Sequence, residues 1–462
     1  MRRSATLLVA ALCCSFILPA GSAAAVDPAT SSIQHLVVIV EENSTYDHTF
    51  GTLPLTDGIT GGKPSETQLG NHRQRLEPFT RLPIPSFDVP PGEEILSNGV
   101  AAAKEAFNRG AMNGFYRAQE EAGKNGSVAF SYLDRRTPSP WRRLARQGVV
   151  FDRYFSSALG GSLPNTLNMV AGTSDGLTDS SQQSLETLLN HGPQTIFDAA
   201  SFSNTVSWRY YVGGISQLDE GKILNGTYAR SRRSAPSQLY WAPILSMSRF
   251  WEDPSLRANI RSQNDFFHDA AIGQLPNITY VLPQPTTHEP RVLGPDLRVL
   301  SVVNALRSSP QWAHTAALIV WDDWGGYYDH VTPPRGSDGQ QLGFRVPMML
   351  LSPYVQPGTV NQTPLDHSAI PALAASLFGL QGDYGYTQPG RTTFPADVWT
   401  ETPEAPERIV GLSHLPRYTA AGMQHAPSVF ILYLLTIVMI TGVLFVVGVT
   451  LRSTPDQEGT VP

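Results

Sequence analysis

Two short acidic clusters lie far apart in the chain, and each directly follows an apolar, strand-like run. The run at residues 35–40 is followed by Glu41, Glu42 and Asn43, and the run at residues 316–321 is followed by Asp322 and Asp323. In an α/β fold the carboxyl ends of the strands meet at one crevice, so carboxylates from distant parts of the chain can gather there around a cation. The sequence therefore predicts a divalent-cation site of the kind that metal-assisted hydrolases use.

Further apolar, β-branched runs recur between stretches of helical or irregular character. They lie at residues 149–151, 206–212, 278–282, 318–320 and 346–351. Short apolar strands separated by long crossovers are typical of a mostly parallel sheet with helices on both faces. We therefore expect one large α/β domain over residues 26–400, with its sheet sandwiched by helices.

The first 25 residues have the composition of an export signal. Arg2 and Arg3 precede an apolar run at residues 7–19, and small residues at 20–25 provide a cleavage site. Ordinary secretion is the expected route, and the paired arginines leave the twin-arginine route as the alternative.

Both cysteines, Cys13 and Cys14, lie within this signal. The mature protein would then have no thiol, which excludes disulfides and thiolate metal sites; a lipid-anchored cysteine is the alternative. Removing the signal would also change the formal net charge from −6 to −8, because it carries Arg2 and Arg3. No strongly basic surface is expected, which argues against a nucleic-acid partner.

The last part of the chain contains an almost wholly apolar stretch at residues 428–451. Its length matches the ~20 residues that a helix needs to cross a bilayer, so we expect one membrane-spanning helix, with a buried core helix as the alternative. The proline-rich residues 401–427 would form a stalk, and residues 452–462 a cytoplasmic tail. This organisation predicts a single-pass protein of the cell membrane whose large domain lies outside the cytoplasm.

A glycine-rich turn carries a candidate nucleophile. Gly160, Gly161 and Ser162 follow the run at residues 149–151 and open a short helix, in whose first turn Pro164 is allowed. Ser162 is expected at the N-cap, where free N–H groups and the helix dipole favour an anion such as phosphate. The alternative is that Ser162 merely caps the helix.

Several segments carry distinctive motifs in a definite order. They are residues 33–51 with the core HLVVIVEENSTYDHTFG, 110–115, 160–165, 195–198, 312–334 with WDDWGGYYDH, and 345–358. Together they resemble the bacterial phospholipase C and acid phosphatase family, a branch of the alkaline phosphatase-like superfamily. The resemblance covers residues 33 to about 380 and implies an alkaline phosphatase-like fold.

The resemblance also implies a catalytic site. A divalent metal ion would be held by four side chains: Glu42, Asn43, Asp322 and Asp323. Ser162 would attack phosphorus, and coordination to the cation would stabilise its alkoxide. Water would then hydrolyse a phosphoserine intermediate. Oxygen-rich ligands suit Ca, Mg, Mn or Zn without choosing among them.

Three histidines and one asparagine complete the predicted site. His288 and His367 match positions where the family has histidines, and each could ligate the metal, bind phosphate or protonate the leaving oxygen. We expect both to be catalytic, and we expect Asn165 and His330 to contact the phosphate. The alternative for the histidines is a hydrogen-bonded structural role, and for Asn165 a role in the turn.

The sequence departs from the family in two places. The phosphatase branch usually carries a histidine in an Asp-Pro-x-His stretch, but the comparable run at residues 88–92 has none. A leaving-group or phosphate contact is therefore lost or supplied elsewhere. The middle region, residues 216–251, does not align, and it is where substrate choice would lie.

The expected function is hydrolysis of phosphoric mono- or diesters, with phospholipid head groups among the candidate substrates at a membrane. The alternative from another class is a catalytically inactive cell-surface binding protein on the same fold. Sulfatase-like or phosphonate-directed activity is a weaker rival, because the mature chain has no cysteine to become a formylglycine. The oligomeric state is left open.

Overall fold

The computed structural model describes the chain from residue 30 to residue 403 with gaps. The described residues are 30–59, 67–69, 72–74, 96–133, 139–215, 218, 220–227, 230, 236–283, 294–336, 339–382, 384–385 and 393–403. The chain divides into two compact units, Met1–Arg408 and Ile409–Pro462, and every described residue belongs to the first.

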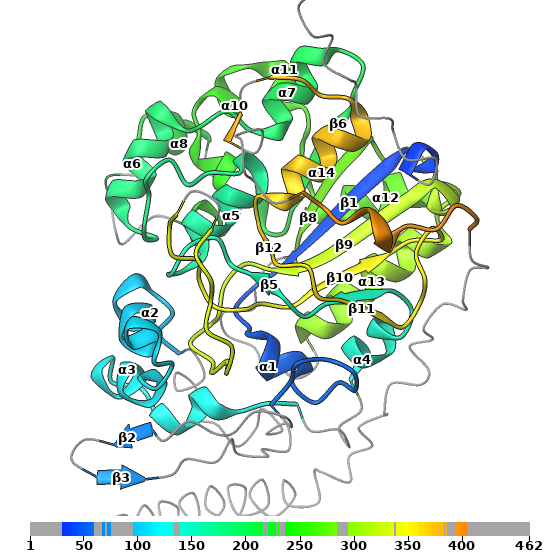
Figure 1. The fold of residues 1–462 in the computed structure, drawn as a ribbon. Helices are drawn as coiled ribbons and strands as arrows, with labels where there is room; N and C mark the ends of the chain where they lie inside the picture. The colour runs from blue at the N-terminus through cyan, green and yellow to red at the C-terminus, as the bar shows by residue number, and fades with distance from the viewer. Residues whose placement is uncertain are drawn as a thin grey trace, which may run out of the picture. The chain divides into compact units, whose positions relative to one another are not determined.

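An eight-stranded sheet forms the centre of the described part (Figure 1). In spatial order its strands are β11 (Thr359–Asn361), β4 (Val149–Phe151), β10 (Met348–Leu351), β9 (Thr315–Trp321), β1 (His35–Glu41), β8 (Ile278–Leu282), β6 (Trp208–Val212) and β7 (Ile260–Ser262). Every pairing is parallel except the two made by β10, which runs against β9 and β4. The predicted mostly parallel sheet is confirmed, with one antiparallel strand inside it.

The two central strands, β1 and β9, are buried along their whole length. A strand covered on both faces is apolar at nearly every position, which explains why both appear in the sequence as continuous apolar runs rather than as alternating ones. The two strands are parallel neighbours in register, with Glu41 opposite Trp321. Their carboxyl ends therefore reach the same edge of the sheet.

Helices cover both faces of the sheet (Figure 1). On one side α5 (Ser162–Ala171), α7 (Ile196–Ser203) and α14 (Ala369–Phe378) pack on one another, and on the other side α12 (Gln263–Ala271) and α4 (Pro140–Ala145) pack on α13 (Gly294–Ser308). This arrangement confirms the predicted layers.

The remaining elements are short. The other α-helices are α1 (Tyr46–Phe50), α2 (Val100–Phe107), α3 (Phe115–Glu121), α6 (Gln182–His191), α8 (Glu220–Leu224), α9 (Gln238–Trp241), α10 (Arg249–Glu252) and α11 (Pro254–Arg257). The 3-10 turns are η1 (Thr30–Ser32), η2 (Asn108–Gly110), η3 (Gly126–Phe130), η5 (Pro243–Ser246), η6 (Trp312–His314) and η8 (Ala396–Val398). Two small sheets pair β12 (Leu365–Asp366) with β5 (Tyr154–Phe155) and β2 (Thr67–Leu69) with β3 (His72–Gln74).

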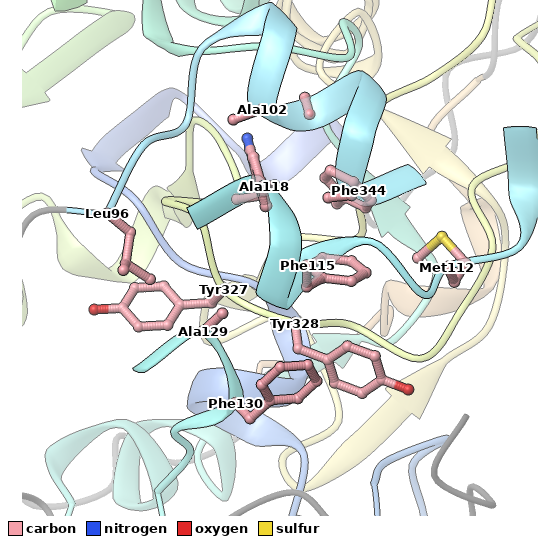
Figure 2. Packing of buried hydrophobic residues seen from close by; sticks show 13 residues of the cluster. Leu96, Ala102, Met112, Phe115, Ala118, Ala129, Phe130, Tyr327, Tyr328 and Phe344 are labelled. Atoms are coloured by element: carbon pink, nitrogen blue, oxygen red, sulfur yellow. The ribbon is translucent and has the colours of Figure 1, made fainter. Parts of the chain in front are cut away.

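The helices α2 and α3 pack on the loop after β9 through one apolar cluster, here called the α2–α3 cluster (Figure 2). Its members are Leu96, Ala102, Ala103, Ala106, Met112, Phe115, Ala118, Ala129, Phe130, Trp324, Tyr327, Tyr328 and Phe344. The ring of Phe115 lies 5.8 Å from that of Trp324 and 5.0 Å from that of Tyr328, centroid to centroid. Burial of these aromatic rings ties the small helical layer to the edge of the sheet.

Several predictions about the chain ends lie outside the described residues. These are the signal at residues 1–25, the apolar segment 428–451, the tail 452–462 and all of the stalk 401–427 except its first three residues. Among the residues that the structure does describe, we find no helix with the length and apolar character needed to cross a membrane.

Candidate active site

The two acidic clusters meet at the carboxyl edge of the sheet, as predicted. Because β1 and β9 are in register, Asn43 and Asp322 follow them side by side, and the Asn43 backbone N–H donates to Asp322 Oδ1 over 3.0 Å. Asn43 adopts the left-handed conformation with φ of 63°. Gly325 packs against it, and a Cβ at this glycine would lie 2.5 Å from the Asn43 carbonyl oxygen. Only glycine permits that approach.

Ser162 joins the same cluster from α5. Its hydroxyl donates to Asp323 Oδ2 over 3.1 Å and to Glu42 Oε2 over 3.4 Å. Three segments that are far apart in the sequence therefore bring the predicted nucleophile and the predicted metal ligands together.

The predicted N-cap position of Ser162 is wrong by one residue. The cap is Gly161, in extended conformation, and Ser162 is the first helical residue. The capping hydrogen bond comes from elsewhere in the chain, since Ser180 Oγ accepts from the Leu163 N–H over 3.0 Å. The Ser162 side chain is thus free of capping and directed at the carboxylates, so the alternative of a purely capping serine fails.

We call Glu42, Asp322 and Asp323 the site carboxylates. Asp322 and Asp323 are fully buried and Glu42 is half-buried. Burial raises the pKa of Glu42 and of Asp323 well above the usual range, and the charge of Asp322 raises both further. Burial also raises the pKa of Asp322 to about 6, against the opposing hydrogen bond from Asn43. Like charges in a low-dielectric environment disfavour the ionised forms.

The site carboxylates fit a divalent cation. Among the described residues, neither Lys nor Arg forms an ion pair with any of them. Glu42 Oε1 and Asp322 Oδ2 are buried without a hydrogen-bond partner. Buried carboxylates are normally paired or bound to metal, and an all-oxygen ligand set suits a hard cation.

Sequence reasoning missed Asn98. This half-buried residue precedes α2, and its Nδ2 donates to Asn43 Oδ1 over 2.7 Å and to Asp323 Oδ2 over 2.9 Å. Nothing local distinguishes an asparagine near a helix start from an ordinary turn residue. The one sequence signal for Asn98 was its place shortly before the motif at residues 110–115.

His367 lies behind the site carboxylates rather than among them. Its Nε2 donates to the Asp322 carbonyl oxygen over 2.7 Å, and its Nδ1 accepts from the Tyr154 hydroxyl over 2.6 Å. Burial lowers the pKa of His367 to about 4, so the ring is neutral at physiological pH. Both ring nitrogens are occupied, which matches the structural alternative, and the catalytic role of His367 stays a prediction.

His330 belongs to a separate charged group, here called the Arg345 cluster: Asp47, Asp57, Asp329, His330 and Arg345. His330 Nδ1 lies 2.7 Å from Asp47 Oδ2, and its Nε2 lies 3.1 Å from Asp57 Oδ1. Ligand atoms of Asp47, Asp329 and His330 lie within 4.8 Å of one another, close enough for a metal site. The buried Arg345 guanidinium, however, already pairs with Asp47 and Asp329. Both ring nitrogens of His330 are therefore engaged within the Arg345 cluster, and its contact with phosphate stays a prediction.

Asn165 takes the turn role. It is fully buried, its Oδ1 accepts from the Ala158 N–H over 2.8 Å, and its Nδ2 donates to the Ala158, Gly160 and Gly161 carbonyl oxygens. The side-chain amide has no donor left for a phosphate oxygen. Asn165 instead shapes the loop that leads to Ser162. His288 lies outside the described residues.

The sequence pattern of the Phosphoesterase family matches residues 33–381. The chain belongs to this family. Non-specific phospholipase C1 of Arabidopsis thaliana is 27% identical over 393 residues, which cover 76% of this chain and 68% of the plant protein. Phospholipase C A of Mycobacterium tuberculosis is 28% identical over 399 residues, covering 76% and 74%.

A solved structure from the alkaline phosphatase superfamily, from Vibrio parahaemolyticus, shares 10% identity with a TM-score of 0.33, covering 55% of this chain and 62% of that one. The family membership confirms the resemblance seen in the sequence, and this phosphoesterase is a hydrolase that acts on phosphoric esters.

Proposed function

We propose that this phosphoesterase is a metal-dependent enzyme with Ser162 as its nucleophile, exported and held at the cell membrane by residues 428–451. The observation that carries the catalytic part is the position of Ser162 Oγ, 3.1 Å from Asp323 Oδ2 at the carboxyl edge of the sheet. The anchoring part rests on the apolar length of residues 428–451.

The site carboxylates and Asn43 would hold the divalent cation. Support comes from the two buried carboxylate oxygens without partners and from the absence of a Lys or Arg pair among the described residues. When bound, the cation would neutralise negative charge on the phosphoryl oxygens and on the serine oxygen.

Ser162 Oγ attacks phosphorus, so that an O–P bond forms while the bond from phosphorus to the leaving oxygen breaks. Asp323, which accepts the hydroxyl hydrogen bond in the resting structure, is the first acceptor of the proton. The positive end of the dipole of α5, a helix of 10 residues, and the Ser162 N–H stabilise charge on the phosphoryl oxygens, since the Leu163 N–H already donates to Ser180 and Pro164 has no N–H. Water then hydrolyses the phosphoserine, which releases phosphate or its monoester and restores Ser162.

His288 or a water molecule donates the proton to the leaving oxygen. His330 and His367 each have both ring nitrogens hydrogen-bonded, which leaves His288 as the remaining member of the predicted trio. As substrate we propose a phospholipid head group. Two relatives are named phospholipase C, and residues 428–451 would hold the enzyme at a bilayer.

An inactive binding protein is the weaker proposal. Such a protein would be expected to lose a ligand or the nucleophile, whereas Ser162, Asn43 and the site carboxylates are all present and interconnected by hydrogen bonds.

The catalytic proposal is tested on the full chain in detergent with nitrophenyl phosphate, bis-nitrophenyl phosphate and phosphatidylcholine. We expect Ser162→Ala to lower kcat on the order of 10³-fold or more, as loss of a covalent nucleophile does in other hydrolases. Chelation should abolish wild-type turnover, and an added divalent cation should restore it. The exposed Ser237, at the start of α9, provides the control Ser237→Ala. Full turnover by Ser162→Ala would refute the nucleophile, and turnover indifferent to prolonged chelation would refute the metal.

The anchoring proposal has its own test. Cells expressing the full chain should retain it in the membrane fraction, and deletion of residues 428–462 should release it. Recovery of both forms in the same fraction would contradict the anchor.

A further inference from the structure

Asn98 links two of the residues assigned to the cation. Its Nδ2 lies 2.7 Å from Asn43 Oδ1, and 3.0 and 2.9 Å from the two carboxylate oxygens of Asp323. It also lies beside the start of α5, because a Cβ at Gly161 would be 3.8 Å from the same nitrogen. Asp323 Oδ2 thus receives hydrogen bonds from both Asn98 and Ser162.

The backbone on both sides of this side chain is held in place. Gln119, fully buried in α3, accepts from the Ser97 N–H over 2.7 Å and donates to the Ser97 carbonyl oxygen over 2.8 Å. Trp324 Nε1 donates to the Asn98 carbonyl oxygen over 2.9 Å. These contacts fix the Asn98 Cα position, so the side chain has little freedom beyond its own rotation.

The α2–α3 cluster anchors the same turn through apolar contact. Leu96 is buried in it beside Tyr327 (Figure 2). Gly326, with φ of 86°, permits this contact, since a Cβ there would lie 2.4 Å from Leu96 Cβ. Hydrogen bonds and packing therefore join the α2–α3 layer to the site through a single side-chain amide.

We propose that Asn98 is a positioning residue that orders Asn43 and Asp323 for cation binding. The inference rests on the proposed function, because it presumes that these two residues are ligands. The amide has two N–H bonds, which is enough to donate to Asn43 Oδ1 and to the Asp323 carboxylate together. It is also neutral, so it orients the ligands without cancelling the negative charge that attracts the cation, as Lys or Arg would. Partners of metal ligands act in this way.

The experiment measures cation affinity directly, on the metal-free full chain in detergent. Wild type and Asn98→Ala are titrated calorimetrically with the chlorides of Ca, Mg, Mn and Zn. For the cation that wild type binds best, we expect Asn98→Ala to bind about 10- to 100-fold more weakly, the range found for lost partners of metal ligands. Activity should follow the same shift, with kcat largely restored at saturating cation and the half-activating concentration raised by that factor.

Two further variants make the result decisive. Asn190→Ala removes an exposed asparagine on α6 and should bind the cation like wild type. Asn98→Ser keeps one donor and should fall between wild type and Asn98→Ala; where the alanine variant does not fold, the serine variant is judged in its place. Affinity within twofold of wild type for the Asn98 variants overturns the inference while leaving the proposed function intact. Absence of cation binding by wild type overturns both.

Discussion

The site carboxylates and the Arg345 cluster both lie in the segments that follow β1 and β9, yet their charges are balanced differently. In the Arg345 cluster, a buried guanidinium donates to Asp47 Oδ1 over 2.9 Å and to Asp329 Oδ1 over 3.1 Å. The site carboxylates have no such internal cation among the described residues, and two of their buried oxygens lack a partner.

The difference fits the proposed function, in which the Arg345 cluster stabilises the fold and the site carboxylates bind the cation. Arg neutralises the charge of the buried carboxylates in the Arg345 cluster. Buried carboxylates without a counter-charge are energetically unfavourable unless a cation binds to them. Removing the Arg345 cation from its cluster should therefore destabilise the protein, whereas removing a carboxylate from the site carboxylates should stabilise the metal-free protein.

The largest effect is expected from Arg345→Met. This change takes the guanidinium away from the buried Asp329 carboxylate and leaves Asp47 paired with His330, and we expect the free energy of unfolding to fall by about 3–5 kcal/mol. Urea denaturation measures it. The matched control is Arg257→Met, which breaks an exposed pair with Glu220 and should cost about 0–1 kcal/mol. Equal losses in the two variants would mean that the Arg345 cluster is not a buried structural unit.

The next effect concerns His330 and pH. Burial alone would lower the pKa of His330, but the hydrogen bond and charge of Asp47 outweigh it and raise the pKa to about 9. Since this exceeds the usual value of about 6.5, the contribution of His330 to stability is complete below about pH 6.5 and is lost as pH rises through 9. It amounts to about 3 kcal/mol at most.

His330→Gln tests this pH dependence. Urea denaturation at pH 6 and at pH 9.5 should show the variant less stable than wild type at the lower pH, with the gap closing at the higher pH. The exposed His191 provides the control His191→Gln. A gap that is constant across this range would show that protonation of His330 does not contribute to stability.

The smallest effect on stability, but one of opposite sign, is expected from Asp323→Asn. Removing one of the mutually repelling site carboxylates should raise the melting temperature of the metal-free protein, because burial and Asp322 disfavour the ionised form. The same change removes a proposed metal ligand, so kcat should fall by at least the roughly 10- to 100-fold that loss of a partner of a metal ligand costs. Thermal scans with chelator and turnover assays measure the two effects, with Asp175→Asn on an exposed turn as control. A lower melting temperature would contradict the contrast between the clusters.

Much of the framework could be predicted locally. The apolar runs before Glu42 and Asp322 became β1 and β9, because a strand buried on both faces needs apolar residues throughout. The run at residues 346–351 was also recognised, and its core is β10. Its antiparallel direction was not predicted, because strand direction depends on the connection and leaves no mark in the composition of the strand itself.

The site was predicted less completely, for a related reason. The helix start near Ser162 was placed one residue late because the capping hydroxyl belongs to Ser180, further along the chain. Asn98 was missed, and His367 and Asn165, which were expected to act in the chemistry, have their side-chain nitrogens engaged in hydrogen bonds within the protein. For Asn98 and His367 the partners lie in segments far away in the sequence, so their positions depend on how those segments pack, whereas the partners of Asn165 lie in the loop directly before it and their position depends on the path of that loop.

What the amino-acid sequence determined by itself was the class of fold and the two strands that carry the site carboxylates, because periodicity and strand ends are local properties; the resemblance to a family added the expected roles of the site residues. Only the tertiary structure decided that Asn98 contacts Asp323 and that Arg345 neutralises one acidic cluster and not the other. Hydrogen bonds and ion pairs act over a few ångströms, and folding alone brings residues from distant parts of a chain within that range.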